Sequence, residues 1–144
     1  MKDITNKIVI NAPLDQVWDL LINPEKTPEY MYTCAIESTF EEGSKVVWRG
    51  IHDDVIYVTG KLLQIEPSKK MTYTVIDPNA DYPQVEENHL KVSYLLESRG
   101  DKVLLQVTQS GYESVAEGQA RYDEAIESGG WSSILEKIKE MAEK

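Results

Sequence analysis

The fold is decided by the last part of the chain, which reads GGWSSILEKIKEMAEK from Gly129 to Lys144. Its apolar side chains recur three and four positions apart, the spacing that brings side chains to one face of an α-helix. The residues of this apolar stripe are Trp131, Ile134, Leu135, Ile138, Met141 and Ala142. We therefore predict one long amphipathic helix from Arg121 to Lys144, laid across an apolar surface with Trp131 as its largest apolar side chain.

Two consecutive glycines fall inside this predicted helix. Gly129 and Gly130 each cost roughly 1 kcal/mol relative to alanine at a helical position, so we expect a compensating close approach of the backbone to the surface beneath. The stripe places position 130 nearer the apolar side than position 129. A methyl group added at 130 is therefore expected to push against strand side chains. The alternative is that the pair marks a helix start or a break near Ser128.

The residues before this helix read mostly as β-strand. Ile4–Ile10 alternates in a way that predicts a half-buried first strand. A short helix is expected to begin near Pro13 and to end at Asn23-Pro24. A second short helical piece is expected from Thr27 to Met31.

From Ala35 onward the apolar pattern has a period of two residues, which predicts β-strands. The six expected strands are Ala35–Phe40, Lys45–Gly50, Ile56–Ile65, Met71–Ile76, His89–Ser98 and Lys102–Ser110. Most connections between them are too short for a parallel crossover, so we expect an antiparallel sheet. The later strands have one apolar face, which the C-terminal helix would cover. The predicted fold class is therefore α+β, in the order strand, two short helices, six strands and a long helix.

The bulk properties narrow the classes of function. The chain has 144 residues, which fits a single domain over residues 1–144. Its net charge of −10 argues against a nucleic-acid footprint and against binding to an anionic membrane, because both need clustered Lys and Arg. Charged residues interrupt the apolar ones from Met1 to Ile22. We therefore expect no signal peptide, no membrane insertion and a reducing, cytoplasmic location.

Four short motifs occur in an order and spacing that one family shares. They are Ala12-Pro13 with Val17-Trp18-Asp19, then Asn23-Pro24-Glu25, then Gly60 to Pro67 with Met71-Thr72-Tyr73-Thr74, and finally Gly130-Trp131 with Leu135. On these motifs the chain, from Ile4 to Met141, resembles the activator of heat-shock protein 90 ATPase homologue-like family. That family lies within the START-like (SRPBCC, birch-pollen-allergen-like) helix-grip superfamily.

The resemblance implies a curved antiparallel sheet that grips the C-terminal helix, with a cavity for apolar ligands between them. Two segments depart from the family's pattern. The aromatic pair often found after the first helix is Tyr30-Met31-Tyr32 here, and the turn before the third strand is Glu42-Gly43-Ser44. Both are expected at the rim of the cavity, so they bear on the identity of the ligand rather than on the fold.

Polar and aromatic groups are interleaved with apolar ones on the predicted inner face, a composition typical of a small-molecule site. We predict seven ligand-binding residues: Trp48, Tyr73, Val75, Tyr94, Gln109, Trp131 and Leu135. Val92, Leu105 and Val107 would complete the wall. The alternative is that all of these are core residues whose polar atoms are satisfied by neighbours or by water.

Other titratable side chains have simpler interpretations. His52 lies in a predicted turn and His89 opens a strand; either could act in acid–base chemistry, but a solvated loop histidine is the simpler assignment. Cys34 has no disulfide partner and is expected to be buried and inert. No metal-type Cys/His spacing and no nucleophile, phosphate-loop or dinucleotide motif is present in the sequence. We therefore assign no catalytic residue, no metal and no cofactor.

Two classes of function remain. The first is a binding protein, a monomer or weak homodimer, that holds a hydrophobic or amphipathic molecule (lipid-like or polycyclic) under the helix. The second is a cyclase- or hydrolase-like enzyme of the same fold that uses a pocket Tyr or His. The family resemblance alone adds a third, a co-chaperone-type interaction module. The sequence contains no polar dyad at a clear spacing, so we rank binding first.

Overall fold

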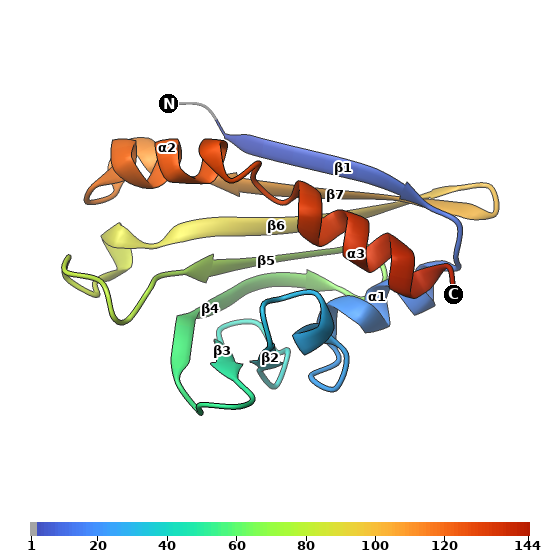
Figure 1. Ribbon diagram of the computed structural model, residues 1–144, viewed down its shortest axis with the longest axis horizontal. Helices are drawn as coiled ribbons and strands as arrows, with labels where there is room; N and C mark the ends of the chain where they lie inside the picture. The colour runs from blue at the N-terminus through green and yellow to red at the C-terminus, as the bar shows by residue number, and fades with distance from the viewer. Residues whose placement is uncertain (1–2) are drawn as a thin grey trace.

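The computed structural model describes residues 3–144 and contains one antiparallel sheet of seven strands (Figure 1). The strands are β1 (Ile4–Ile10), β2 (Cys34–Glu37), β3 (Lys45–Gly50), β4 (Ile56–Glu66), β5 (Lys70–Val75), β6 (Leu90–Arg99) and β7 (Lys102–Ser110). Their order in the sheet is β1-β7-β6-β5-β4-β3-β2. The first strand therefore pairs with the last, and β1 and β2 form the two edges.

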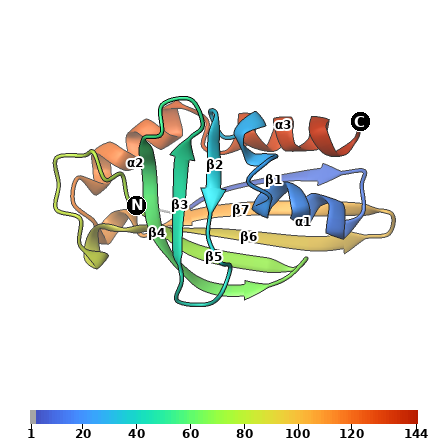
Figure 2. The same cartoon turned by 90° about the horizontal axis from the view of Figure 1, so that it is seen from below.

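The sheet curls because β4 bends between its two partners, so that β2 and β3 cross over the longer strands (Figure 2). The first half of β4 pairs with β3 and the second half with β5, and the register shifts between Leu62 and Gln64. Bulges of this kind increase the local twist. Gly60 lies at the bend, where a Cβ atom would be 1.7 Å from the carbonyl oxygen of Thr74. Only glycine allows that approach.

Helices lie along the concave side of the sheet. They are α1 (Leu14–Ile22), α2 (Gly118–Glu127) and α3 (Ser132–Ala142), with short 3₁₀ turns η1 (Thr27–Glu29), η2 (Glu86–Asn88) and η3 (Tyr112–Ser114). The helix α3 runs along β1 and contacts α1 near the C-terminus (Figure 1). Leu21, Leu105 and Ile138 join α1, the sheet and α3 in one buried core. Within residues 3–144, no helix is long and apolar enough to cross a membrane.

The predicted fold class is confirmed, and β1, β3 and β7 have the predicted bounds. The strand β2 ends at Glu37, three residues before the predicted end. The reason is local, because the Ser38 hydroxyl accepts a hydrogen bond from the N–H of Phe40, whose φ is +58°. The second helical piece is a single 3₁₀ turn.

The predicted continuous C-terminal helix is two helices, α2 and α3, so this part of the prediction is corrected. Gly129 and Gly130 both have left-handed backbone angles, with φ of +85° and +61°. The N–H of Gly130 bonds back to the carbonyl of Ala125 and ends α2. Glycine adopts this conformation without a steric penalty, which is why a pair of glycines ends one helix and redirects the chain into the next. The alternative of a break near Ser128 is therefore correct. The expected close approach to strand side chains is also present, at Gly130, where an added Cβ would lie 2.5 Å from Oδ1 of Asn6.

Candidate functional site

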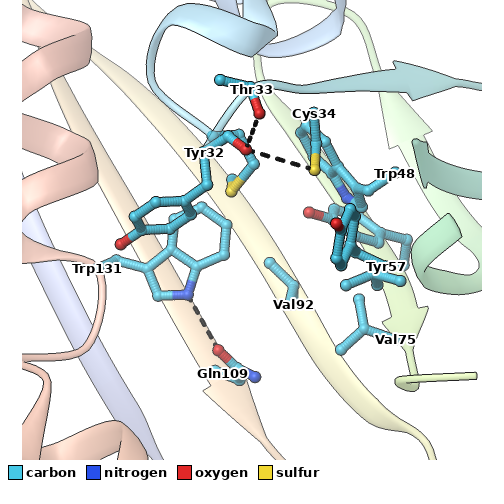
Figure 3. Close-up of a pocket in the computed structure, with 12 residues that line it drawn as sticks. Tyr32, Thr33, Cys34, Trp48, Tyr57, Val75, Val92, Gln109 and Trp131 are labelled. Carbon is cyan, nitrogen blue, oxygen red and sulfur yellow. Dashed lines mark hydrogen bonds between the residues drawn. The ribbon is translucent and has the colours of Figure 1, made fainter. Parts of the chain in front are cut away.

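A cavity of about 460 Å³ lies between the concave face of the sheet and the loop that follows η1 (Figure 3). The residues that line it are Met31, Tyr32, Thr33, Cys34, Trp48, Tyr57, Val58, Tyr73, Val75, Val92, Gln109 and Trp131. They come from the loop, from strands β2 to β7 and from the residue immediately before α3. None of them carries a charge and five are aromatic. The cavity is therefore apolar, with a few placed polar atoms.

Five of the seven residues predicted for the site line this cavity. They are Trp48, Tyr73, Val75, Gln109 and Trp131. Tyr94 and Leu135 lie outside its lining and are buried in the main core. The same holds for Leu105 and Val107, whereas Val92 is part of the lining. Residues on one strand face share a side of the sheet, but the curl brings only some of them to the cavity.

An aromatic row connects the cavity to the core behind it. The ring of Tyr94 meets those of Tyr73 and Trp131 edge-on, with centroid distances of 5.6 and 5.8 Å. This edge-to-face arrangement is the favourable one for aromatic rings. The hydroxyl oxygens of Tyr73 and Tyr94 lie 2.7 Å apart in a buried hydrogen bond. Tyr94 therefore supports two cavity residues without lining the cavity.

The two buried hydroxyls are neutral at physiological pH. Burial raises the pKa of Tyr73, and hydrogen bonding with Tyr94 and with the Trp48 indole opposes this rise only in part. Burial also raises the pKa of Tyr94 well above its usual value, as does the neighbouring Tyr73. Both groups therefore keep their protons near pH 7 and can donate hydrogen bonds, but they are poor general bases there.

Gln109 and Trp131 form the second polar contact of the cavity wall. The indole Nε1 of Trp131 donates to Oε1 of Gln109 at 3.0 Å (Figure 3). The backbone N–H of Trp131 donates in turn to Oδ1 of Asn6 on β1, also at 3.0 Å. Trp131 is thus held at both its backbone and its side chain, directly before α3.

The mouth of the cavity is formed by a loop, Met31 to Thr33, that contains none of the seven predicted site residues. Tyr32 and Thr33 both have left-handed backbone angles, with φ of +50° and +62°. The Tyr32 side chain is 72% exposed, and the Thr33 hydroxyl donates to the Tyr32 carbonyl at 2.6 Å. Tyr57 of β4 completes the rim and donates a hydrogen bond to the Asp53 carboxylate. In the sequence, the signal for this rim was Tyr30-Met31-Tyr32, which departs from the family's usual aromatic pair and was expected at the rim.

The cysteine and the two histidines considered above as reactive residues are not arranged for catalysis in the cavity. Cys34 lines the cavity but is buried, and burial raises the pKa of its thiol, with the charge of Asp53 adding to that effect. His52 is exposed in the turn after β3, and His89 contacts the Val85 carbonyl through Nδ1. Neither histidine lines the cavity. No group of three or more His, Cys, Asp or Glu side chains within residues 3–144 is placed to hold a metal ion.

A curled antiparallel sheet closed by a C-terminal helix, with an apolar cavity next to the start of that helix, defines the helix-grip class of α+β proteins. The model of one family, described as Activator of Hsp90 ATPase homolog 1-like protein, matches residues 11–143. The chain belongs to this family, as its motifs predicted. Among curated proteins, none shows a significant sequence match to it.

Solved structures repeat this fold. ChR145 from Cytophaga hutchinsonii is 30% identical, with a TM-score of 0.73 over 98% of this chain and 93% of its own. The Aha1 dimer from Colwellia psychrerythraea is 17% identical, with a TM-score of 0.73 over 99% of this chain and 97% of its own. CalU16 from Micromonospora echinospora is 20% identical, with a TM-score of 0.69 over 95% of this chain and 71% of its own. The last two likenesses concern the fold alone.

Proposed function

We propose that the protein binds a hydrophobic or amphipathic small molecule in the cavity between the sheet and the loop that follows η1, with Trp131, directly before α3, in its wall. The observation that supports this function is the cavity itself, whose volume of about 460 Å³ lies in the usual range for ligand sites. The cavity opens to solvent at its mouth, so its aromatic and aliphatic walls expose apolar surface to water when no molecule covers them. An apolar hollow of this kind is typical of a small-molecule site.

The expected driving force is the burial of apolar surface. Burying about 200 Å² of a ligand's apolar surface contributes roughly 5 kcal/mol to the binding free energy. The ligand's loss of translational and rotational freedom opposes this gain. The aromatic rings of Trp48, Tyr57 and Trp131 supply large contact areas with few rotatable bonds. The walls are thus suited to a rigid or polycyclic molecule as well as to an acyl chain.

The buried hydroxyl groups of Tyr73 and Tyr94 support a second candidate function, that of an enzyme with the same fold. Tyr73 lines the cavity and stays protonated, so it could donate a proton or a hydrogen bond to a bound substrate. A base would have to come from another group, because the two histidines lie outside the lining. Binding therefore ranks above catalysis. A co-chaperone role, a weak homodimer and a cytoplasmic location remain predictions.

Two measurements test the binding proposal. Native mass spectrometry of the purified protein is expected to reveal a small molecule that dissociates at higher collision energy. After its removal, titration with the neutral fluorophore N-phenyl-1-naphthylamine should saturate at one molecule per chain and change the emission of Trp48 and Trp131. A folded protein that binds neither a co-purifying molecule nor the fluorophore would show that the cavity has no ligand.

A further inference from the structure

The one primary amide in the cavity lining, that of Gln109, has its orientation set by Trp131. An indole N–H can only donate a hydrogen bond, so the amide atom that it meets at 3.0 Å is the oxygen. The amide nitrogen then lies on the side away from Trp131 (Figure 3). Gln109 therefore presents its N–H donors to the cavity while its oxygen is already engaged.

Tyr73 supplies a second donor in the same cavity. The hydroxyls of Tyr73 and Tyr94 carry two protons, and the 2.7 Å hydrogen bond between them uses only one. When Tyr94 donates, the proton of Tyr73 is left for another acceptor. Of the two residues only Tyr73 lines the cavity, so that acceptor can be an atom of a ligand.

The charges around the cavity disfavour an ionised ligand. No lining residue carries a charge, so a buried carboxylate or phosphate would have no counter-ion. The net charge of the chain, −10, opposes the approach of an anion further. The carboxylate of Asp53 is engaged at the rim by Tyr57. The hydroxyls of Thr33 and Tyr57 have used their protons in the rim and can only accept. Gln109 and Tyr73 offer the donors that remain, and these suit a neutral acceptor.

We infer that the cavity selects an uncharged ring compound that carries a carbonyl oxygen, and that the amide N–H of Gln109 determines this specificity. Trp131 stands on one side of the space and Trp48 and Tyr57 on the other (Figure 3), an arrangement that suits a flat ring system. This inference rests on the proposed function, because it names the ligand class of the same site.

The test uses probes that differ in one group. Fluorene and 9-fluorenone share a tricyclic skeleton, and only the ketone carries an acceptor. Their affinities are measured by displacement of N-phenyl-1-naphthylamine. The affinity of the ketone relative to the hydrocarbon is expected to fall roughly fivefold in Gln109→Met, since the variant keeps the length of the side chain and loses the N–H donor. Gln106→Met, on the outward face of β7, is the matched control and should leave the ratio unchanged.

A second variant guards against a folding defect. Gln109→Glu, studied at pH 8, keeps an acceptor for the Trp131 indole and removes the amide donors, so the same fall in the ratio is expected. Because its carboxylate has no counter-ion in the cavity, a cooperative urea transition verifies that the variant is folded. Two charged tricyclic probes test whether the cavity selects a neutral ligand. The anion 9-fluorenone-1-carboxylate carries its charge next to the ketone, so a bound ketone would bury the charge with it, and proflavine is a cation. Both should bind at least roughly tenfold more weakly than the neutral ketone.

The outcomes separate the two proposals. If fluorene binds, but the affinity of 9-fluorenone relative to fluorene is unchanged in both Gln109 variants, the inference is wrong and the proposed function stands. If the anion or the cation binds more tightly than the ketone, the cavity does not select a neutral molecule, which also overturns the inference. If no probe displaces the fluorophore because the fluorophore itself does not bind the folded protein, both proposals fail.

Discussion

Asn6 on the first strand accepts a hydrogen bond from the backbone N–H of Trp131, 125 residues later, at a distance of 3.0 Å. The same side chain donates through Nδ2 to the hydroxyl of Ser132 at 3.2 Å. These two bonds fix the start of α3 to the edge of the sheet. They also place the Trp131 indole in the cavity wall, so the position of the helix and the shape of the site depend on one contact.

Gly130 is the residue that this contact constrains most. A Cβ atom at Gly130 would lie 2.5 Å from Oδ1 of Asn6 and 3.1 Å from Cγ2 of Ile4. Gly130→Ala should therefore destabilise the protein by about 2–4 kcal/mol, from left-handed backbone strain and overpacking together. Urea melts measure this loss.

Gly129→Ala is the matched control for that prediction. Gly129 has the same left-handed backbone, but its added Cβ would meet only the Ser132 hydroxyl at 3.9 Å. Backbone strain alone predicts a loss of about 1–2 kcal/mol. Equal losses in the two variants would mean that Gly130 is not limited by its neighbours on β1.

Filling the cavity should abolish binding without unfolding the protein. Val75→Trp adds a large side chain to a half-buried wall position, so the affinity for N-phenyl-1-naphthylamine should fall at least roughly tenfold. Leu95→Trp, an exposed position on the opposite face of β6, is the control. Fluorescence titration gives the affinity, and a cooperative urea transition verifies folding. Full affinity in the Val75 variant would place the fluorophore elsewhere.

The buried hydroxyl pair should behave as one unit. Tyr73→Phe leaves the Tyr94 hydroxyl without its partner, and Tyr94→Phe leaves the Tyr73 hydroxyl with only the Trp48 indole, so each variant should lose about 1–3 kcal/mol. The double variant leaves no unpaired hydroxyl, and its loss should be smaller than the sum of the two single losses. A double-mutant cycle from urea melts gives the coupling energy. Strictly additive losses would contradict a hydrogen bond between the two groups.

The pKa values of the buried tyrosines predict how stability changes in alkali. Burial raises the pKa of Tyr30, Tyr73 and Tyr94 above the unfolded value of about 10. Above that pH the unfolded chain binds fewer protons than the folded one, so the free energy of unfolding falls as the pH rises. The slope is at most about 1.4 kcal/mol per pH unit for each such tyrosine. Below pH 10 this contribution is fully present.

The double variant Tyr73→Phe with Tyr94→Phe provides the comparison. It removes two of the shifted groups, so its stability should decline less steeply between pH 9.5 and 11.5 than that of the unaltered protein. Urea melts across this range measure both slopes. Identical slopes would show that these two hydroxyls do not titrate differently in the folded and unfolded states.

Much of the architecture was predictable because its signals are local. The alternation of Ile4–Ile10 and of Lys102–Ser110 lies within each strand, and both were predicted with the observed bounds. The apolar stripe from Ile134 to Ala142 likewise belongs to one helix. The break at Gly129-Gly130 was harder to predict, because a glycine pair is compatible with a costly helix interior as well as with a left-handed turn.

The sequence by itself determined most of the strands, the α+β class and the inward face of each late strand, since these follow from the spacing of apolar residues along the chain. The tertiary structure alone decided which inward residues border the cavity. Tyr73 and Tyr94 both point inward, yet only Tyr73 reaches the open space. The physical reason is the bend of β4 at Gly60 and the position of Trp131 directly before α3, which depend on contacts between residues far apart in the chain.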